Sequence, residues 1–530
     1  MRVKSVFSCI ILAFCSVPLW AGNGAEIIYR TGKEYQSAEF SAIASGKNIA
    51  TSQHAQTRRE FKNRVLNDDS KDDELTTSAN LTLAPFVGVY YSPYNSKDRL
   101  MPTHLIYLYD KIPDAVNFTA GFGIKDSFYA KLVYTASCSK EALADGKGVL
   151  HPASAEYYES GDSPKEGYMS FASDHFSVAL GRFKSGSGNG IMGNLFQNSL
   201  APYYDQFTFS FYSKRVKYYY MLGMSSSYLT KEEKAYLEYE GDPGGTPPIP
   251  PTLDYQYQPL KMFAFHRIEI APADTLTIGI GEMTLVGGKV PDMSMVNPFG
   301  IYHNIYESVY NSYYAAIDIS WVPAKGHFIF AEVVANEIYV KGESNKDPTA
   351  MGQQIGYWFI LPFDTVTKHR VALELTRIDG WTYSDLAPYV TMYQRQTQRE
   401  VKFDVPLGYS LGGDLQQASL IYTAVSKDGI KLNLALSYLR KGEIDFRLKN
   451  PGELDAYMPY TQRRDKKYIP GPTGTIEKWS SADLLLDLPI TERIAINTLA
   501  YYAYIQNFGH ESGKTKHLAF LSLGISIIAF

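Results

Sequence analysis

The segment Lys431–Leu439, with the sequence KLNLALSYL, decides how the rest of the chain is interpreted. Its even-numbered positions carry Leu, Leu, Leu and Tyr, whereas Lys431, Asn433 and two small residues occupy the odd-numbered positions up to 437. Successive side chains of a β-strand point to opposite faces, so this pattern predicts a strand with one apolar and one polar face. Such a strand fits the core of a soluble protein or the wall of a transmembrane barrel.

The same alternation recurs along the chain, and the repetition favours a barrel. In residues 370–376 the apolar residues alternate with Arg370 and Glu374, and in residues 315–320 they alternate with Asp318. A charge on the second face is costly in a dry core but is ordinary on the wet inner wall of a barrel. The polar side chains predicted to face the lumen in these three segments are Asp318, Arg370, Glu374, Lys431 and Asn433.

Residues 266–282 form a predicted hairpin around a Pro-Ala-Asp turn. With Ile270 paired with Leu276 and Ile268 with Ile278 across this turn, the Ile and Leu side chains share one face. Arg267 and Glu269 lie on the other face, and we predict that they also point into the lumen. The same register puts His266 and Glu282 on the outer face, where we expect them at the level of the lipid headgroups.

The spacing of the predicted strands gives a second signal. Outer-membrane barrels join their strands alternately by short periplasmic turns and long extracellular loops. From residue 125 onward short connections such as 272–274 alternate with long ones such as 225–259. We therefore predict an all-β fold, a transmembrane antiparallel β-barrel of about 18 strands, within roughly 16 to 20, because strand ends read from sequence are uncertain by a few residues.

The N-terminus has the layout of a secretory signal peptide. Arg2 and Lys4 precede an apolar run from residue 6 to residue 17, and Ala21 follows at the expected cleavage site. The run is roughly a dozen residues long, which is too short for a spanning helix of about 20 residues. We predict that residues 1–21 are removed on export and that the mature chain resides in the bacterial outer membrane.

Residues 22–80 differ from the rest of the mature chain, because the stretch 53–73 is dense in Arg, Lys and Asp and poor in apolar residues. A core is not expected there. We expect a flexible or weakly helical periplasmic arm, or a partial plug, followed by the barrel over residues 81–530. The last residue, Phe530, ends an apolar strand and resembles the signal that the barrel-assembly machinery binds.

Composition argues against several classes of function. The net charge of -4 does not suit a protein that binds nucleic acid. Of three cysteines only Cys138 lies in the mature chain, so neither an internal disulfide nor a cysteine metal site can form. The His residues are scattered without metal-ligand spacing. We expect no metal and no cofactor.

Two short motifs imitate enzyme signatures. Residues 408–412 match G-x-S-x-G around Ser410, but a strand-like run follows where a nucleophile elbow needs a helix. Residues 188–193 match G-x-G-x-x-G, although no strand-turn-helix unit surrounds them, which favours a flexible loop. We therefore expect no catalytic residues and no enzyme activity.

The 42 tyrosines have a structural and a functional interpretation. Barrels concentrate aromatic residues in girdles at both membrane faces, and this accounts for most of them. Those in the predicted extracellular loops have a second use, because aromatic faces beside polar groups suit sugar rings. The candidate glycan contacts are Tyr302, His303, Tyr306, Tyr310, Trp381 and Tyr383, with loop packing as the alternative for each.

Four short stretches between residues 170 and 440 carry a family resemblance. They are Gly181–Lys184 with the glycine-rich run to Gly193 and Ala201-Pro202; His266–Glu269 with Gly281-Glu282 and Gly287-Gly288; Asn297–Phe299; and Pro406–Asp414. In this order and spacing they resemble the Wzi family of outer-membrane capsule-assembly proteins. The resemblance implies an 18-stranded barrel with an occluded lumen that holds capsular or other exopolysaccharide without catalysis. The helical bundle of that family is not evident in residues 27–80.

Two functions remain open from the sequence, and an outer-membrane hydrolase is a third that is disfavoured because no convergent Ser, His and acid set can be placed. The first is a non-enzymatic barrel that binds surface polysaccharide or helps to assemble or retain it, with outer-membrane lipid and the glycan as its partners. The second is a channel for small or hydrophobic solutes, as in porins or FadL-like barrels, which the charged lumen faces suggest. An occluded lumen would favour the first and an open lumen the second.

Overall fold

The computed structural model describes most of the barrel wall and part of its interior. The described residues are 23–66, 76–93, 100–101, 111, 114–138, 146–150, 158–159, 164–201, 203–225, 260–287, 290–305, 311–338, 349–362, 366–384, 390–398, 401–426, 428–444 and 471–529. The predicted signal peptide and Phe530 lie outside these residues. Within the described part, no helix is long and apolar enough to cross a membrane.

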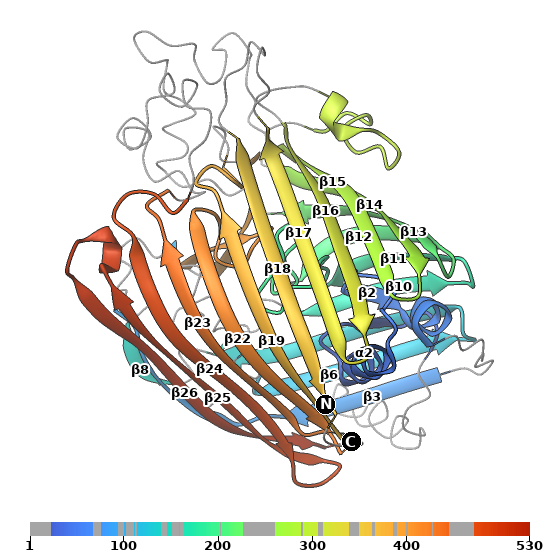
Figure 1. Cartoon of the computed structure of the whole chain (residues 1–530). Helices are drawn as coiled ribbons and strands as arrows, with labels where there is room; N and C mark the ends of the chain where they lie inside the picture. The colour runs from blue at the N-terminus through green and yellow to red at the C-terminus, as the bar shows by residue number, and fades with distance from the viewer. Residues whose placement is uncertain are drawn as a thin grey trace, which may run out of the picture.

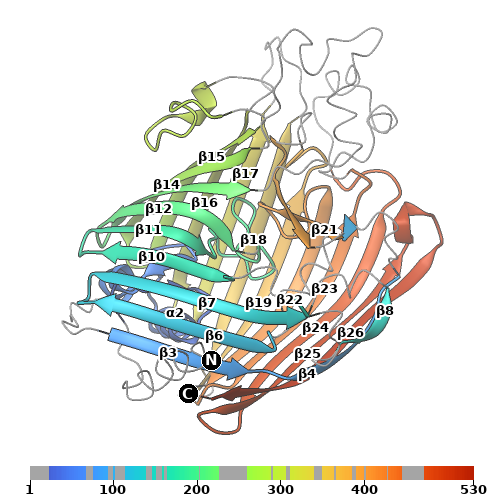
Figure 2. The same cartoon turned by 180° about the vertical axis from the view of Figure 1, so that it is seen from behind.

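The strands form one closed antiparallel wall (Figures 1 and 2). Their bounds are β3 (Thr76–Leu83), β4 (Phe86–Tyr91), β6 (Val116–Ile124), β7 (Phe128–Cys138), β8 (Lys147–Leu150), β9 (Tyr158–Glu159), β10 (Glu166–Ala172), β11 (Phe176–Phe183), β12 (Tyr204–Tyr212), β13 (Val216–Ser225), β14 (Lys261–Ala273), β15 (Leu276–Gly287), β16 (Asn311–Ala324), β17 (His327–Glu337), β18 (Ala350–Leu361), β19 (Thr367–Ile378), β22 (Leu415–Ser426), β23 (Lys431–Lys441), β24 (Glu477–Pro489), β25 (Ile494–Gln506) and β26 (Thr515–Ile528).

The ring closes where the last strand of the chain pairs with the first strands of the wall. β26 pairs with β4 and, at its end, with β3, so β3 and β4 together form one strand of the wall. β6 and β8 share the next position, and β7 then pairs with β10 and β9. The result is an 18-stranded barrel, which confirms the predicted fold class and strand number.

The hairpin of β14 and β15 has the predicted faces but a different register. Ile268 lies opposite Ile280, and Ile270 lies opposite Ile278, because a β-bulge follows Ile270. The sequence predicts partners two residues closer to the turn. A shift of two residues leaves every side chain on its expected face, since faces alternate with a period of two.

The outer face of the wall is apolar, as a lipid-facing surface requires. In β23, Leu434 and Leu436 are 38% and 49% exposed, whereas the inward Ala435 is buried. We call the following exposed side chains the apolar belt: Ile268, Ile270, Ile280, Ile317, Ile319, Leu373, Leu375, Leu434, Leu436, Leu521 and Leu523.

The N-terminal residues 23–66 form a folded segment inside the barrel, at the end that carries the short turns (Figures 1 and 2). It consists of β1 (Ile27–Tyr29), α2 (Lys33–Ser45), β2 (Ala55–Thr57), α3 (Arg58–Phe61) and the π-helical turn η1 (Lys62–Leu66). We call residues 23–66 the inner segment.

The sequence predicts no core in residues 22–80 and leaves a periplasmic arm or a partial plug open, whereas the inner segment is folded and has buried apolar residues. Phe40 and Ile43 on α2 are buried against inward-facing Phe328 and Trp358 of the wall. The helix ends at Gly46, whose φ of 88° lets its N–H close the last turn. The wall also begins earlier than the predicted residue 81, since β3 starts at Thr76. The inner segment has few apolar residues, and several of them pack against apolar side chains on the inner wall of the barrel.

Smaller elements lie at the mouth opposite the short turns or on the outside. β5 (Leu100–Met101), β20 (Tyr393–Gln398) and β21 (Val401–Pro406) make a separate three-stranded sheet. The 3₁₀ turns are η3 (Tyr302–Asn304) and η5 (Phe508–His510).

A charge placed on the apolar belt tests the orientation of the wall. Leu436→Arg should lower the free energy of unfolding in lipid vesicles by about 2–4 kcal/mol, because the guanidinium would face hydrocarbon. The measurement is a urea titration of the folded chain in vesicles, with Leu436→Val as the matched control. Equal stability of the Arg variant and the parent chain would contradict a lipid-facing Leu436.

Candidate functional site

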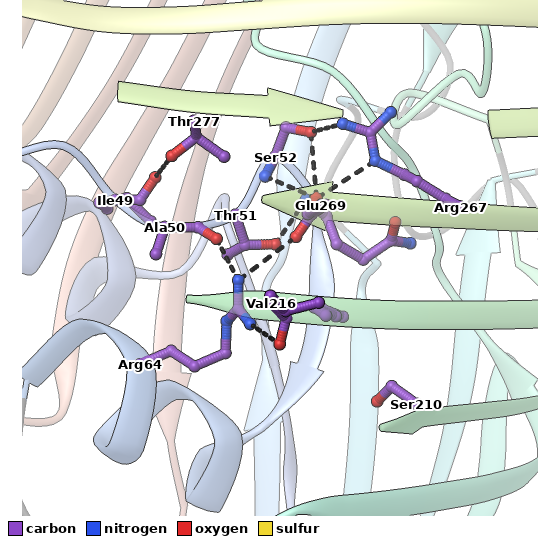
Figure 3. A network of polar contacts seen from close by, with 12 residues as sticks. Ile49, Ala50, Thr51, Ser52, Arg64, Ser210, Val216, Arg267, Glu269 and Thr277 are labelled. Carbon is purple, nitrogen blue, oxygen red and sulfur yellow. Dashed lines mark hydrogen bonds and ion pairs between the residues drawn. The ribbon is translucent and has the colours of Figure 1, made fainter. Parts of the chain in front are cut away.

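The barrel interior near the short turns contains a network of buried charges (Figure 3). Arg267 donates to Glu269 Oε1 at 3.2 Å and to Ser52 Oγ at 2.6 Å, and it pairs with Asp318 at 2.5 Å. Glu269 also accepts the Ser52 N–H at 3.0 Å. Gly279 makes room for this cluster, because a Cβ there would overlap the Arg267 guanidinium. The predicted lumen residues thus bind the inner segment rather than water.

Arg64 links the network to the next strand. Its guanidinium donates to the carbonyls of Ser213 and Val216 at 2.8 and 3.0 Å and to the carbonyl of Ala50. The same group lies 3.7 Å from Glu269 Oε2. Since Arg64 belongs to η1, it connects the inner segment to the turn before β13 at several points (Figure 3).

Further ion pairs hold the inner segment around the ring. Glu60 of α3 pairs with the buried Lys217 of β13 at 2.5 Å. On the opposite side Glu39 of α2 pairs with Arg30 and lies 4.0 Å from Arg370 of β19. Arg370 also stacks over the Trp358 ring at 4.4 Å. Because breaking a buried pair leaves an uncompensated charge, these contacts resist removal of the segment.

A second stretch, residues 184–201, crosses the interior between β11 and β12. Two carboxylates of the wall hold its backbone. Glu374 accepts the N–H groups of Ile191 and Met192 at 2.9 and 3.1 Å. Glu332 accepts those of Leu195 and Phe196 at 3.2 and 3.1 Å. We call residues 184–201 the crossing loop.

The crossing loop contains the G-x-G-x-x-G match. Gly188 and Gly193 have φ values of 124° and 146°, which other residues rarely adopt. The glycines therefore permit a path along which the N–H groups reach the carboxylates. This is a fixed loop rather than the flexible one that the sequence suggests, and no strand-turn-helix unit surrounds it.

The crossing loop and the inner segment also contact each other. His54 Nε2 lies 2.8 Å from the carbonyl of Gly188, to which Arg30 donates at 2.8 Å as well. Desolvation inside the barrel and the Arg30 guanidinium lower the pKa of His54 to about 3. The ring is therefore neutral at pH 7, and its N–H donates to Gly188.

An apolar layer completes the filling of the interior. Leu195 and Phe196 are fully buried, and the Phe196 ring lies 5.0 Å from that of Phe265. One buried cluster joins these residues to inward-facing side chains on strands from β4 to β26, among them Trp479 and Phe520. The sequence predicts a wet, charged inner wall. In the structure the charges are paired and a dry layer lies beside them, because the two inner stretches displace water.

The remaining predicted lumen residues also have protein partners. Asn433 accepts from Thr423 Oγ1 at 2.9 Å, and Arg370 donates to the same hydroxyl at 3.1 Å. Lys431 donates to the carbonyl of Thr31 at 3.4 Å. The inner segment thus contacts β23 as well.

The four candidates for glycan contact that the structure describes do not gather in one place. Tyr383 is fully buried in the interior and donates to the Leu195 carbonyl at 2.6 Å. Trp381 is 5% exposed, and Tyr302 is fully buried on the outside of the wall. These three rings are covered in this conformation, whereas His303 is exposed. Tyr306 and Tyr310 lie outside the described residues.

Ser410 is not placed as a nucleophile. Its hydroxyl donates to the carbonyl of Met192 at 3.0 Å, and β22 follows the motif instead of a helix. Within the described residues no group of three His, Cys, Asp or Glu side chains could hold a metal ion.

Several residues that organise the interior are absent from the predictions. Glu332 is the only charge in the apolar run 328–335, and Lys217 precedes the continuous run 218–222, so neither strand shows the alternation that identified the other lumen residues. Asp414, with a φ of 54°, accepts the N–H groups of Ile444 and Thr473 at 2.9 and 3.0 Å. It joins three loop stretches, and only its place at the end of the Pro406–Asp414 motif hints at this role.

Comparison with known proteins shows the fold. No family model and no curated protein matches the chain. Among solved structures, Wzi of Escherichia coli, described as an outer-membrane carbohydrate-binding β-barrel involved in group 1 capsule assembly, superimposes with a TM-score of 0.53. The match has 12% identity and covers 96% of this chain and 99% of Wzi. This chain therefore has the fold of an outer-membrane barrel.

Two porins are more distant matches. OprD of Pseudomonas aeruginosa has 10% identity and a TM-score of 0.41, over 85% of this chain and 93% of OprD. The anion-selective porin of Comamonas acidovorans has 8% identity and a TM-score of 0.33, over 86% of this chain and all of the porin.

Removing Glu269 tests whether the buried charges hold the inner segment. Glu269→Ala leaves Arg267 and Arg64 without this carboxylate. It should lower the free energy of unfolding by about 3–5 kcal/mol. We expect the inner segment to become sensitive to trypsin at Arg58 and Arg59 while the barrel stays intact. Limited proteolysis followed by mass spectrometry measures this, with Ser78→Ala in the wall strand β3 as the control. Resistance equal to the parent chain would show that the network is dispensable.

Proposed function

We propose that the chain is a non-enzymatic barrel of the bacterial outer membrane that binds surface polysaccharide or helps to assemble or retain it. The observation that carries this proposal is the filled interior. An 18-stranded barrel is wide enough for an aqueous channel, yet here the inner segment and the crossing loop occupy the lumen. A permanently open pore for solutes is not supported by this arrangement.

The choice of polysaccharide as the partner has separate support. The fold matches along nearly the whole of Wzi, whose description names carbohydrate binding and capsule assembly. The sequence motifs that resemble the Wzi family also have defined places here, since His266–Glu269 and Pro406–Asp414 each anchor loops or inner stretches. These likenesses motivate the proposal, and binding by this chain is what the experiments must establish.

Glycan binding is tested on the purified chain and in cells. We expect the chain in detergent to bind a subset of bacterial surface polysaccharides on an array. A deletion strain should shed more polysaccharide into the medium than its parent, and the intact gene should restore retention. No array binding together with unchanged retention would refute the polysaccharide role.

His303, which is exposed, and the two candidates outside the described residues give a sharper version of this test. Replacing His303, Tyr306 and Tyr310 together by Ala should weaken glycan binding more than tenfold, if two stacked rings each contribute about 1 kcal/mol. Tyr438→Ala, which removes an aromatic ring from the outer wall of β23, is the control and should bind normally. Equal affinity of the two variants would remove these residues as contacts.

Conductance separates the polysaccharide role from the channel alternative. The intact chain should be silent in planar lipid bilayers if the inner segment and the crossing loop together close the lumen. The double variant Glu332→Ala and Glu374→Ala deprives four loop N–H groups of their acceptors and should produce open steps. Steady conductance of the intact chain would instead favour a porin-like or FadL-like function.

A further inference from the structure

Residues 290–305 lie against the outside of the barrel wall, and we call them the wall segment. The Tyr220 hydroxyl of β13 donates to the Val296 carbonyl at 2.6 Å, and His266 Nδ1 lies 3.1 Å from the Pro298 carbonyl. The Tyr302 ring stacks on His266 with 4.6 Å between centroids and 14° between planes. Figure 1 shows the segment in yellow-green beside the upper ends of β14 and β15.

The wall segment covers a polar pair on the outer face. His266 and Glu282 are direct partners across β14 and β15, and their side chains approach to 3.5 Å. Glu282 also accepts the Tyr302 N–H at 2.9 Å. These are the two residues that the sequence places at headgroup level. In the structure, protein rather than lipid headgroups surrounds them.

The height of this contact places it beside the membrane. His266 precedes the turn residue Asp274 by eight positions, and at about 3.3 Å per residue with a tilt near 40° this corresponds to roughly 20 Å of height. The apolar band of such barrels is about 25 Å tall. The wall segment therefore reaches down to the level of the outer leaflet.

Many backbone groups of the wall segment are paired within the protein, which favours a place beside lipid. In hydrocarbon, polar backbone groups must be paired within the protein. Successive turns pair Met295 with Asp292, Gly300 with Asn297, and Ile305 with Tyr302. The Pro298 carbonyl also accepts from the Tyr218 hydroxyl. An ordinary extracellular loop could leave such groups to water.

Apolar side chains that project outward from the wall segment continue the apolar belt, among exposed polar residues such as Asp292 and Asn297. Met293, Phe299 and Ile301 are 81%, 72% and 59% exposed. On the same outer face of the strands beneath, Ile268 and Ile280 are 47% and 56% exposed. Exposed apolar patches of this kind mark interaction surfaces, and continuity with the belt identifies lipid as the occupant.

We propose that the wall segment is a lateral membrane anchor that inserts Met293, Phe299 and Ile301 into the outer leaflet. It widens the lipid-facing surface of β13 to β15 and shields the His266–Glu282 pair from hydrocarbon. The anchor rests on the proposed placement of the barrel in the outer membrane. Its partner is the acyl region of the lipid, whichever glycan the barrel binds.

Spin labels in vesicles test the anchor. On a Cys138→Ser background, Phe299→Cys is labelled and the chain is reconstituted into phosphatidylcholine and phosphatidylglycerol vesicles. Accessibility to oxygen and to a water-soluble nickel chelate is then measured. Ile280→Cys in the apolar belt is the lipid-facing control, and Glu511→Cys beside η5 is the water-facing control. Met293→Cys repeats the test in case the label at position 299 disturbs its ring contact with Tyr218.

We expect labels at positions 299 and 293 to prefer oxygen over the nickel chelate several-fold, as at position 280, with the reverse at position 511. Preference for the nickel chelate at both positions, while position 280 prefers oxygen, would overturn the anchor and leave the barrel in place. Water-like behaviour at position 280 would instead refute the membrane placement itself. Spin–spin broadening that falls as lipid is added would identify a second copy as the occupant and would also overturn the proposal.

Discussion

The pairing of backbone polar groups without water is the constraint on which the rest of this structure depends. A sheet that faces hydrocarbon cannot leave an edge open, because each unpaired N–H or C=O group there costs several kcal/mol. β26 therefore pairs with β4, and β7 with β10, to complete an 18-stranded ring. Closure also explains the outer surface, where apolar residues such as Leu436 and Ile280 remain exposed in a folded protein.

A closed ring of this width also encloses an interior, which either water or protein must fill. The inner wall carries charges that water would normally solvate, but here two stretches of the same chain take the place of water. Each inner charge then needs a protein partner, and the network of Arg267, Glu269, Asp318 and Ser52 supplies one for the inner segment. Glu332 and Glu374 do the same for the crossing loop through backbone N–H groups. The paired charges beside the apolar layer fix the position of each stretch, since a misplaced one would leave charges buried and unpaired.

The wall could be predicted from the sequence because its information is local. The alternation within Lys431–Leu439 indicates which side chains face lipid. A register error of two residues in the β14–β15 hairpin moves no side chain to the other face of the sheet. The inner segment could not be predicted in the same way. Its Arg64, Glu60 and Ser52 look like solvated residues in sequence, because their partners lie on strands more than 100 positions away. The covered rings of Tyr302 and Tyr383 illustrate the same limit, since an aromatic residue in a loop carries no local sign of what packs over it.

The stretch His266–Glu269 shows how one short motif can serve both sides of the wall. Its odd positions, Arg267 and Glu269, hold the inner segment, while the even position His266 holds the wall segment through the Pro298 carbonyl and the Tyr302 ring. Alternation along a strand makes this division unavoidable, because neighbouring side chains can never share a face. The two contacts lie on opposite surfaces of a single layer of backbone, so a shift of β14 along its neighbours would disturb the interior and the outer surface together. That coupling gives a physical reason for a polar His266 on a strand whose outward side chains nearer the turn, Ile268 and Ile270, suit lipid alone.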